Sequence, residues 1–329
     1  MFFLTWFCLC DKERTDAMIL FETSNWSVEY IFNHPLENFR LAVAGETVRP
    51  EGAEKMEIAL WNDAVLKKKK VLEDAGLTTQ LSEQGFRHSL LAKKPEQEKF
   101  GPAMVPGTQY RLVRVNGDTL VVEPVVFSEL FALQDRGFRE LYEKAGLVLP
   151  HGPLAVVVYI QTGWHMDTRS ILLGTVRGKG TPKYPGGIWG VGGDLDTPVI
   201  TLEEFLVTRE LREELVVPGG VTDYTAIGLM FDKVLRKHDL VVWARTASPF
   251  EEIRKGEVYL ADVDSITALP TGKVRLASFL VHHFFPTADP NDPQWVGRPT
   301  AACSGGLFAY GAMTYGEEWA KDVLPYLTA

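Results

Sequence analysis

The stretch from residue 152 to residue 286 constrains the fold most, because it alternates β-rich runs with one helical segment. Two runs rich in β-branched residues come first, "LAVVVYIQT" and "SILLGTVRG". After a helix at 202–215 follow three more runs, "TAIGLMF", "DLVVWARTA" and "EVYLADV", and a closing helix, "VRLASFLVHHFF". Strands interrupted by one such helix predict an α/β fold, specifically an α/β/α sandwich on a mixed sheet.

The chain before residue 150 has a different pattern and predicts a smaller α+β domain. Two short strands are expected within 27–45, helices at 52–75 and 128–145, and a hairpin around Asn116-Gly117, a dipeptide that favours a type I′ turn. The segment "GLVLPHGPL", with two prolines and two glycines, marks a boundary. The expected organisation is an N-terminal extension at 1–17, an α+β domain at 18–150, the sandwich domain at 151–290, and a C-terminal extension at 291–329 that packs on the domains.

Composition argues against several classes of partner. The net charge of −9 does not favour nucleic-acid binding through a broad basic surface. The apolar start "MFFLTWFCLC" is too short to span a bilayer and lacks a basic leader, so no membrane contact is expected. Cys8, Cys10 and Cys303 form neither a disulfide framework nor a zinc spacing, which favours a reducing compartment, the cytoplasm. A homodimer stays open.

The helix at 202–215 has a well-defined start and a buried side. Thr201 can cap its first turn, with Glu204 completing a capping box. Its apolar stripe recurs every four residues, at Val207, Leu211 and Leu215.

The same helix carries a cluster of carboxylates in "RELREEL". Glu210, Glu213 and Glu214 are spaced i, i+3 and i+4, so they share one side beside the apolar stripe. One reading is an exposed acidic face, because like charges on a helix surface cost only a few tenths of a kcal/mol. The glycine-rich segment upstream and the adjacent Arg209 favour a second reading, a site for Mg²⁺ or Mn²⁺, which prefer oxygen ligands.

These residues resemble the signature of the Nudix hydrolase family. That signature is a glycine, five residues, a glutamate and seven residues, followed by Arg-Glu-apolar-any-Glu-Glu-any-Gly-apolar. Its second half is matched here by Arg209, Glu210, Leu211, Glu213, Glu214 and Val217. Upstream, "IWGVGGDLD" is similar to the family's aromatic-to-"PGG" lead-in. The resemblance covers about residues 152–286, with the signature itself at about 193–217, and it implies the sandwich fold expected above.

The signature departs from the family pattern at several positions. Thr201 stands where the family has its first glutamate, and Val216 replaces the glycine after the helix. Val191 stands where proline is usual. The segment from Gly193 to Arg209 is two or three residues longer than usual, which leaves four acidic residues open as substitutes for the first glutamate: Asp194, Asp196, Glu203 and Glu204.

The resemblance implies a metal-dependent hydrolase that cleaves a diphosphate linkage in a nucleoside diphosphate joined to another moiety. Glu210, Glu213 and Glu214 would bind Mg²⁺, or Mn²⁺, together with the backbone carbonyl of Gly193. Arg209 lies four residues before Glu213 and would orient its carboxylate, although a plain surface ion pair is the alternative.

The same resemblance assigns the catalytic base less uniquely. A glutamate of the cluster, Glu213 or Glu214, would accept a proton from the attacking water. A later residue could do so instead, and among Glu251, Glu252 and Glu257 the last aligns best with the family pattern.

The expected substrate is a small nucleotide-type molecule. We expect Lys179 and Lys183 to contact phosphate groups and Trp189 to contact the substrate. The alternative for the two lysines is a loose surface loop. The departures from the signature leave open a second function, a ligand-binding, sensor or scaffold protein with the same fold. A lyase or isomerase using the same metal site is a third.

Overall fold

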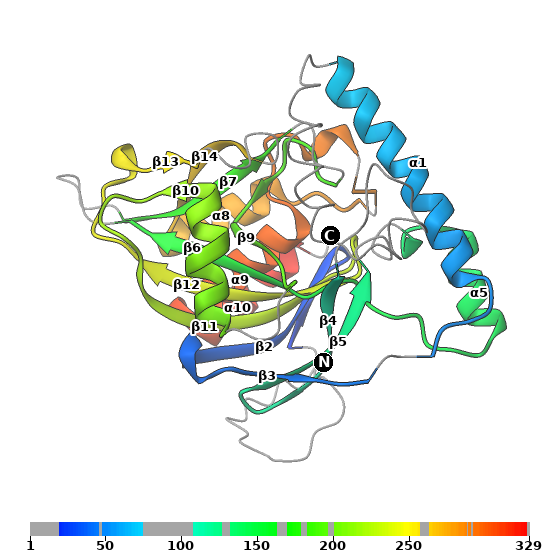
Figure 1. Cartoon of the computed structure of the whole chain (residues 1–329). Helices are drawn as coiled ribbons and strands as arrows, with labels where there is room; N and C mark the ends of the chain where they lie inside the picture. Colours follow the sequence, from blue (N-terminus) through cyan, green and yellow to red (C-terminus); the bar gives the residue numbers. More distant parts are fainter. Residues whose placement is uncertain are drawn as a thin grey trace.

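A computed structural model describes residues 20–45, 48–74, 108–126, 132–162, 170–178, 183–196, 201–256, 263–287, 289–290 and 292–327. Within these residues a nine-stranded sheet forms the centre of the molecule (Figure 1). Its strands are β1 (Phe21–Glu22), β2 (Trp26–Pro35), β6 (Ala155–Gln161), β7 (Ile171–Arg177), β8 (Ile188–Trp189), β9 (Val191–Asp194), β11 (Thr222–Asp232), β12 (Lys237–Arg245) and β14 (Val263–Pro270).

The sheet is mixed, as expected, with β6 near its middle. The path runs β1-β2-β11-β12-β6-β7-β14, with β9 paired to β6 and β8 paired to β7. Strand β6 is parallel to β12 on one side. Its other edge is shared, because β9 pairs antiparallel with residues 155–158 and β7 with residues 160–161. The remaining neighbours of the path are antiparallel.

Alternate residues of β6 face two separate apolar cores. Ala155, Val157 and Tyr159 face the core formed with the C-terminal helices. Val156 and Val158 face the core formed with the helical segment 202–214. In Figure 1 that segment lies on the near face of the sheet, and α9 and α10 lie on the far face. The α/β/α sandwich on a mixed sheet is therefore confirmed.

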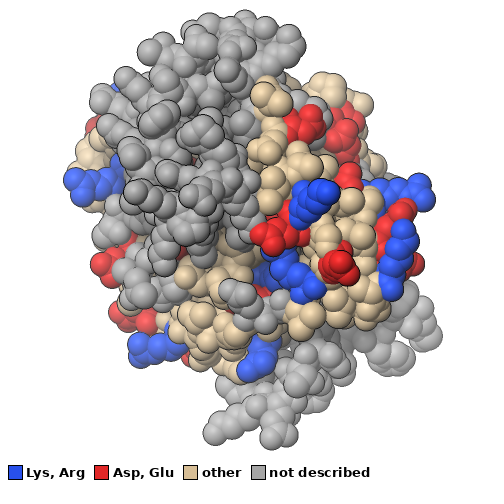
Figure 2. Space-filling model, turned by 45° about the vertical axis from the view of Figure 1, so that its right-hand side comes forward, with Lys and Arg blue, Asp and Glu red and all other residues tan. Residues whose placement is uncertain are grey.

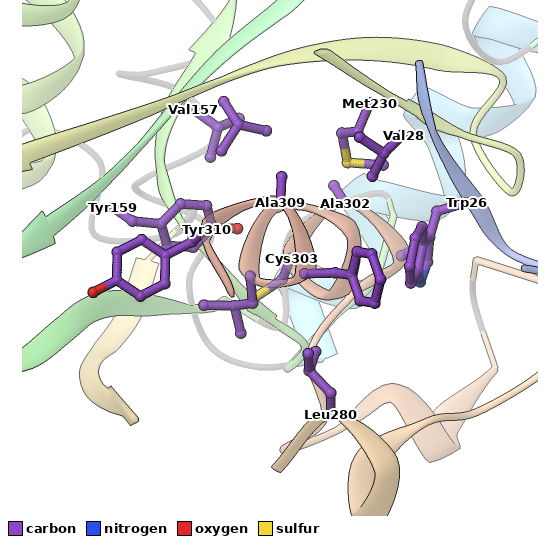
Figure 3. Close-up of a cluster of buried hydrophobic side chains, with 14 of the residues drawn as sticks. Trp26, Val28, Val157, Tyr159, Met230, Leu280, Ala302, Cys303, Ala309 and Tyr310 are labelled. Atoms are coloured by element: carbon purple, nitrogen blue, oxygen red, sulfur yellow. The ribbon is translucent and has the colours of Figure 1, made fainter. Parts of the chain in front are cut away.

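The helices of the far face come from the end of the chain: α8 (Lys273–His283), α9 (Ala301–Tyr315) and α10 (Glu317–Val323). All residues of α9 from Ala301 to Ala312 are buried, as its almost wholly apolar sequence requires. In Figure 3, α9 lies between Met230 of the sheet and Leu280 of α8, with Trp26 beside it. The segment expected as a C-terminal extension thus supplies the helix that covers one face of the sheet.

A three-stranded sheet from the N-terminal half packs at the edge of the near-face core. It consists of β3 (Arg40–Val43), β5 (Thr119–Val126) and β4 (Thr108–Asn116) in that order. The backbone of Tyr110 donates to Leu195 O and accepts from Leu154 N, both at 2.8 Å, which joins β4 to the ends of β9 and β6. Since β2 also pairs with β11, segments from both sides of residue 150 build the large sheet. The expected domain boundary near residue 150 stays a prediction.

The hairpin and one helix differ in detail from expectation. Asn116 pairs with Thr119, so the turn residues are Gly117, with a φ of 58°, and Asp118, one position later than expected. Helix α5 spans Arg136–Lys144, because residues 133–134 form a turn and Asp135 caps the helix by accepting from Phe138 N at 2.9 Å. Residues 127–131, where the expected helix begins, lie outside the described residues. Helix α1 (Ala53–Asp74) forms as expected. Residues 1–17 lie outside the described residues.

The remaining elements are short. They are the strand pair β10 (Leu215–Val216) and β13 (Arg254–Lys255), the helical segments α6 (Leu202–Phe205), η2 (Leu206–Leu211) and α7 (Arg212–Glu214), and the 3-10 turns η1 (Leu36–Asn38), η3 (Phe250–Glu252), η4 (Pro293–Trp295) and η5 (Leu324–Leu327). Strand β14 was not expected, because the polar residues within it obscure the β pattern. The strand expected at "EVYLADV" lies outside the described residues except for its last residue, Val263. On the face shown in Figure 2, basic and acidic side chains are interspersed. No helix among the described residues is long and apolar enough to cross a membrane.

The far-face core should depend on contacts between the two ends of the chain. Trp26 of β2 is fully buried, and its ring centroid lies 5.2 Å from that of Phe308 in α9. Trp26→Ala should lower the free energy of unfolding by about 3–5 kcal/mol, measured by urea denaturation, because it leaves a cavity. Val148→Ala, at a residue 88% exposed, is the control. Equal losses in both variants would contradict the shared core.

Candidate functional site

The helical segment that carries the glutamates runs without a break from Leu202 to Glu214 through α6, η2 and α7. Thr201 caps it, since its side chain accepts from the backbone N–H of Glu204 at 3.1 Å, as the sequence predicted. It ends at Glu214, one residue earlier than expected, because Leu215 begins β10 and pairs with Lys255. The helix therefore passes directly into a strand.

The middle of this segment, η2, is a π-helix, a wider turn that accommodates one extra residue. The extra residue changes which side chains face the core. Leu206 and Leu211, five residues apart, are buried, whereas Val207 is 40% exposed. The expected stripe through Val207 is therefore wrong. The wide turn keeps Leu211 and Leu215 on the core side.

Two carboxylates of the helix converge on β9. The Glu210 carboxylate lies directly against Gly193, where a Cβ would be 2.4 Å from Glu210 Oε2. The backbone N–H of Gly192 donates to Glu214 Oε2 at 3.3 Å. One turn of helix thus places Glu210 and Glu214 against the same pair of glycines.

Both glycines are required by this close approach. Gly192 has a φ of 150°, and a Cβ there would be 2.0 Å from the carbonyl oxygen of Val156. Gly193 must lack a Cβ because the Glu210 carboxylate occupies that space. The double glycine of "GVGGD" therefore brings backbone and carboxylates into contact, which accounts for the glycine-rich segment upstream of the helix.

Several other expected site residues are described only in part or not at all. The backbone of Arg209 and Glu213 lies in the helix, but their side chains, like all of Glu257 and Lys179, lie outside the described part. Among the described side chains, no group of three or more His, Cys, Asp or Glu is arranged to hold a metal.

Two of the candidates for substrate contact, Trp189 and Lys183, lie within the described residues. Trp189 packs against the far-face core, with its ring 4.5 Å from Arg177 Cζ and 5.0 Å from Lys237 Nζ. Lys183 is only 9% exposed. Their roles as substrate contacts stay predictions.

Three of the four acidic residues considered as substitutes for the family's first glutamate have different surroundings. Asp194 is bound to Lys237, as described below. Glu203 is half-buried near Tyr224, and burial together with Glu203 raises the pKa of Tyr224 to about 12. Glu204 is exposed at the start of the helix.

A cluster of buried charged groups on the opposite face of the sheet was not expected from the sequence. Lys237 Nζ lies 2.7 Å from Asp194 Oδ1 and 3.5 Å from Asp239 Oδ1. Nearby, the Tyr184 hydroxyl donates to the carboxylate of Asp232, at 3.0 and 3.1 Å from its two oxygens. The signal was present: Asp232, Lys237 and Asp239 are charged residues at the adjoining ends of two strands whose middles are apolar.

No protein-family model matches the chain, and no curated protein matches its sequence. Among solved structures, it is similar to the Nudix domain of NrtR from Shewanella oneidensis, complexed with ADP ribose (TM-score 0.28, 20% identity, 41% of this chain and 82% of that one). It is also similar to a MutT/nudix family protein from Enterococcus faecalis (0.26, 17%, 43% and 54%) and to the Nudix hydrolase RenU from M. smegmatis (0.28, 13%, 50% and 87%). All three carry the name of the family that "RELREEL" resembles.

The contact between Gly193 and Glu210 can be tested by adding one methyl group. Gly193→Ala should lower the free energy of unfolding by about 1–3 kcal/mol, because the new Cβ overlaps the carboxylate. The double variant Gly193→Ala/Glu210→Ala should regain most of that loss. Gly45→Ala, where a Cβ meets nothing within 4 Å, is the control for urea denaturation. An additive double variant would show that the two residues do not touch.

The buried cluster predicts a pH dependence of stability. Burial, with a contribution from the Asp239 carboxylate, raises the pKa of Asp232 to about 7. Between about pH 4 and pH 7 the folded carboxyl keeps a proton that the unfolded chain releases, so stability should fall as pH rises through that range. Asp232→Asn removes this dependence. Urea denaturation across pH checks it, with the exposed Asp264→Asn as control. If the difference in free energy of unfolding between the wild type and Asp232→Asn stayed constant with pH, the raised pKa of Asp232 would be contradicted.

Proposed function

We propose that this chain is a metal-dependent Nudix-type hydrolase that cleaves a diphosphate linkage in a small nucleoside diphosphate-X molecule. The observation that carries the proposal is the convergence of Glu210 and Glu214 on Gly192 and Gly193. The match of "RELREEL" to the second half of the family signature supports it. A fully exposed acidic face would leave these carboxylates in water, whereas here both side chains are half-buried beside β9.

The donor set fits a hard divalent cation. Glu210 and Glu214 supply carboxylate oxygens on one side of β9, and Glu213 lies on the same helical segment. With the carbonyl of Gly193, these residues would hold Mg²⁺ or Mn²⁺, which prefer oxygen ligands. When bound, such an ion neutralises diphosphate oxygens and lowers the pKa of water.

The remaining roles belong to the chain's own residues. The Gly192 N–H fixes the Glu214 carboxylate relative to β9. Arg209 would orient Glu213, one turn later in the same segment. The proton of the attacking water would pass to Glu213 or Glu214, or to Glu257 from the later loop. Lys179, Lys183 and Trp189 are the proposed substrate contacts, and the proposed location is the cytoplasm.

A second candidate function, a ligand-binding, sensor or scaffold protein, is favoured by two observations. Thr201, in the place of the family's first glutamate, has its hydroxyl engaged as the helix cap. Val216, in the place of the family's glycine, lies two residues after the helix and is part of β10 rather than a glycine turn. In that case the fold would retain the carboxylates without turnover.

Hydrolysis can be tested with a panel of dinucleotides, nucleotide sugars, ADP-ribose and nucleoside triphosphates in Mg²⁺, with released phosphate or monophosphate as the measurement. Glu210→Gln and Glu214→Gln should lower the rate by about two orders of magnitude or more, because each ~1.4 kcal/mol of lost stabilisation is a factor of ten. Glu143→Gln, at an exposed helical glutamate of α5, is the matched control.

The two candidate functions give different results in this assay. Turnover that depends on Mg²⁺ and on both glutamates supports the hydrolase. Wild-type rates in Glu214→Gln would exclude this helix as the catalytic site. Binding of a panel member without turnover, measured by calorimetry, would favour the ligand-binding protein.

A further inference from the structure

The buried ion pair between Lys237 and Asp194 lies on the opposite face of the sheet from Glu210. The Lys237 side chain is 4% exposed and that of Asp194 is 14% exposed. Burial alone lowers the pKa of Lys237, but the carboxylates of Asp194 and Asp239 raise it above its ordinary value overall. The contact is therefore between two charged groups largely removed from water, and losing Lys237 would leave the carboxylates of Asp194 and Asp239 without their cation.

This ion pair connects two strands that are not neighbours. Asp194 ends β9 and Lys237 begins β12. Strand β6 lies between them, since Ala155 is the register partner of both Asp194 and Asp239. Ala155 faces the core of the C-terminal helices. The side chains of the ion pair therefore cross β6 on that face.

Strand β9 is short. It has four residues and, among the described strands, forms its ladder with β6, while backbone hydrogen bonds to Tyr110 and Leu154 hold Leu195 just after it. Its last two residues before Asp194 are glycines, which have the most conformational freedom to lose on folding. Successive residues of a strand face opposite sides of the sheet. Holding the Asp194 side chain on the far face therefore also sets the orientation of Gly193 toward the near face, where Glu210 lies.

We propose that Lys237 is a positioning residue for the metal site, which holds Gly192 and Gly193 in place through Asp194. The inference rests on the proposed function, because the glycines matter as the surface on which Glu210 and Glu214 converge. Lys237 itself touches neither the glutamates nor the substrate. Asp194, since it is bound to Lys237 on the far face, belongs to this support rather than to the donors of the site.

The test removes the charges together. In Lys237→Met/Asp194→Asn the two partners are neutralised at once. The Asp239 carboxyl, 3.5 Å from Lys237 Nζ, stays buried; burial already raises its pKa and loss of Lys237 raises it further, which favours the neutral acid over a lone charge. Lys233→Met is the matched control: Lys233 pairs with Glu22 at 2.5 Å, but these side chains are 27% and 55% exposed and the ion pair joins Lys233 to β1 rather than to β9. Two quantities are measured in each protein, backbone hydrogen exchange of the peptide spanning β9 and the affinity for Mn²⁺ by calorimetry.

The proposal predicts faster exchange in β9, unchanged exchange at the far end of β12, and Mn²⁺ affinity about 10- to 100-fold weaker in the double variant. The control should match the wild type. If the double variant does not fold, Asp194→Asn alone, which keeps an oxygen acceptor for Lys237, should show both changes at smaller size.

Unchanged β9 exchange, or faster exchange with wild-type Mn²⁺ affinity, would overturn the positioning role. A wild type that binds no Mn²⁺ would instead overturn the proposed function. The exchange data would still show whether the ion pair holds β9, so the two failures are distinguishable.

Discussion

The alternation of side chains along β6 is the constraint on which the rest of the structure depends. A strand whose two faces are both apolar must be covered twice, and residues 155–160 are all buried. One cover is the helical segment 202–214, and the other is α9, more than 85 residues later in the chain. The same strand also provides the edge on which β9 is built, so the core and the candidate site share one element.

The candidate site follows from how the near-face helix is attached to that strand. Burying Leu206 and Leu211 holds the helix down on the core, and the π turn between them absorbs an extra residue. The result is that Glu210 and Glu214 are half-buried against Gly192 and Gly193. π turns inside helices are often found at functional sites, and here the turn includes Arg209 and Glu210.

The sequence predicted the parts of the fold that follow from local pattern. Periodicity and the cap at Thr201 placed the helix within one residue at each end, and the β-branched runs placed β6 and β12. The pattern was less informative where tertiary contacts decide. Val207 has the spacing of the apolar stripe but is exposed. The π turn instead buries Leu206 and Leu211, which are five residues apart, and the four-residue spacing did not predict such a turn. The C-terminal segment was predicted as an extension and its helix was not recognised, because an apolar, glycine-rich helix has no polar face to reveal its periodicity. The ion pair of Lys237 with Asp194 joins residues 43 positions apart, which no local pattern brings together.

The central claim is that Glu210 and Glu214 bind a divalent cation at the two glycines of β9. The most direct measurement is paramagnetic broadening of backbone amide NMR signals on addition of stoichiometric Mn²⁺. The signals of Gly192 and Gly193 should broaden in the wild type and stay sharp in Glu210→Gln/Glu214→Gln, while those of α10 should be unaffected in both. Sharp glycine signals in the wild type, or equal broadening in the double variant, would contradict the claim.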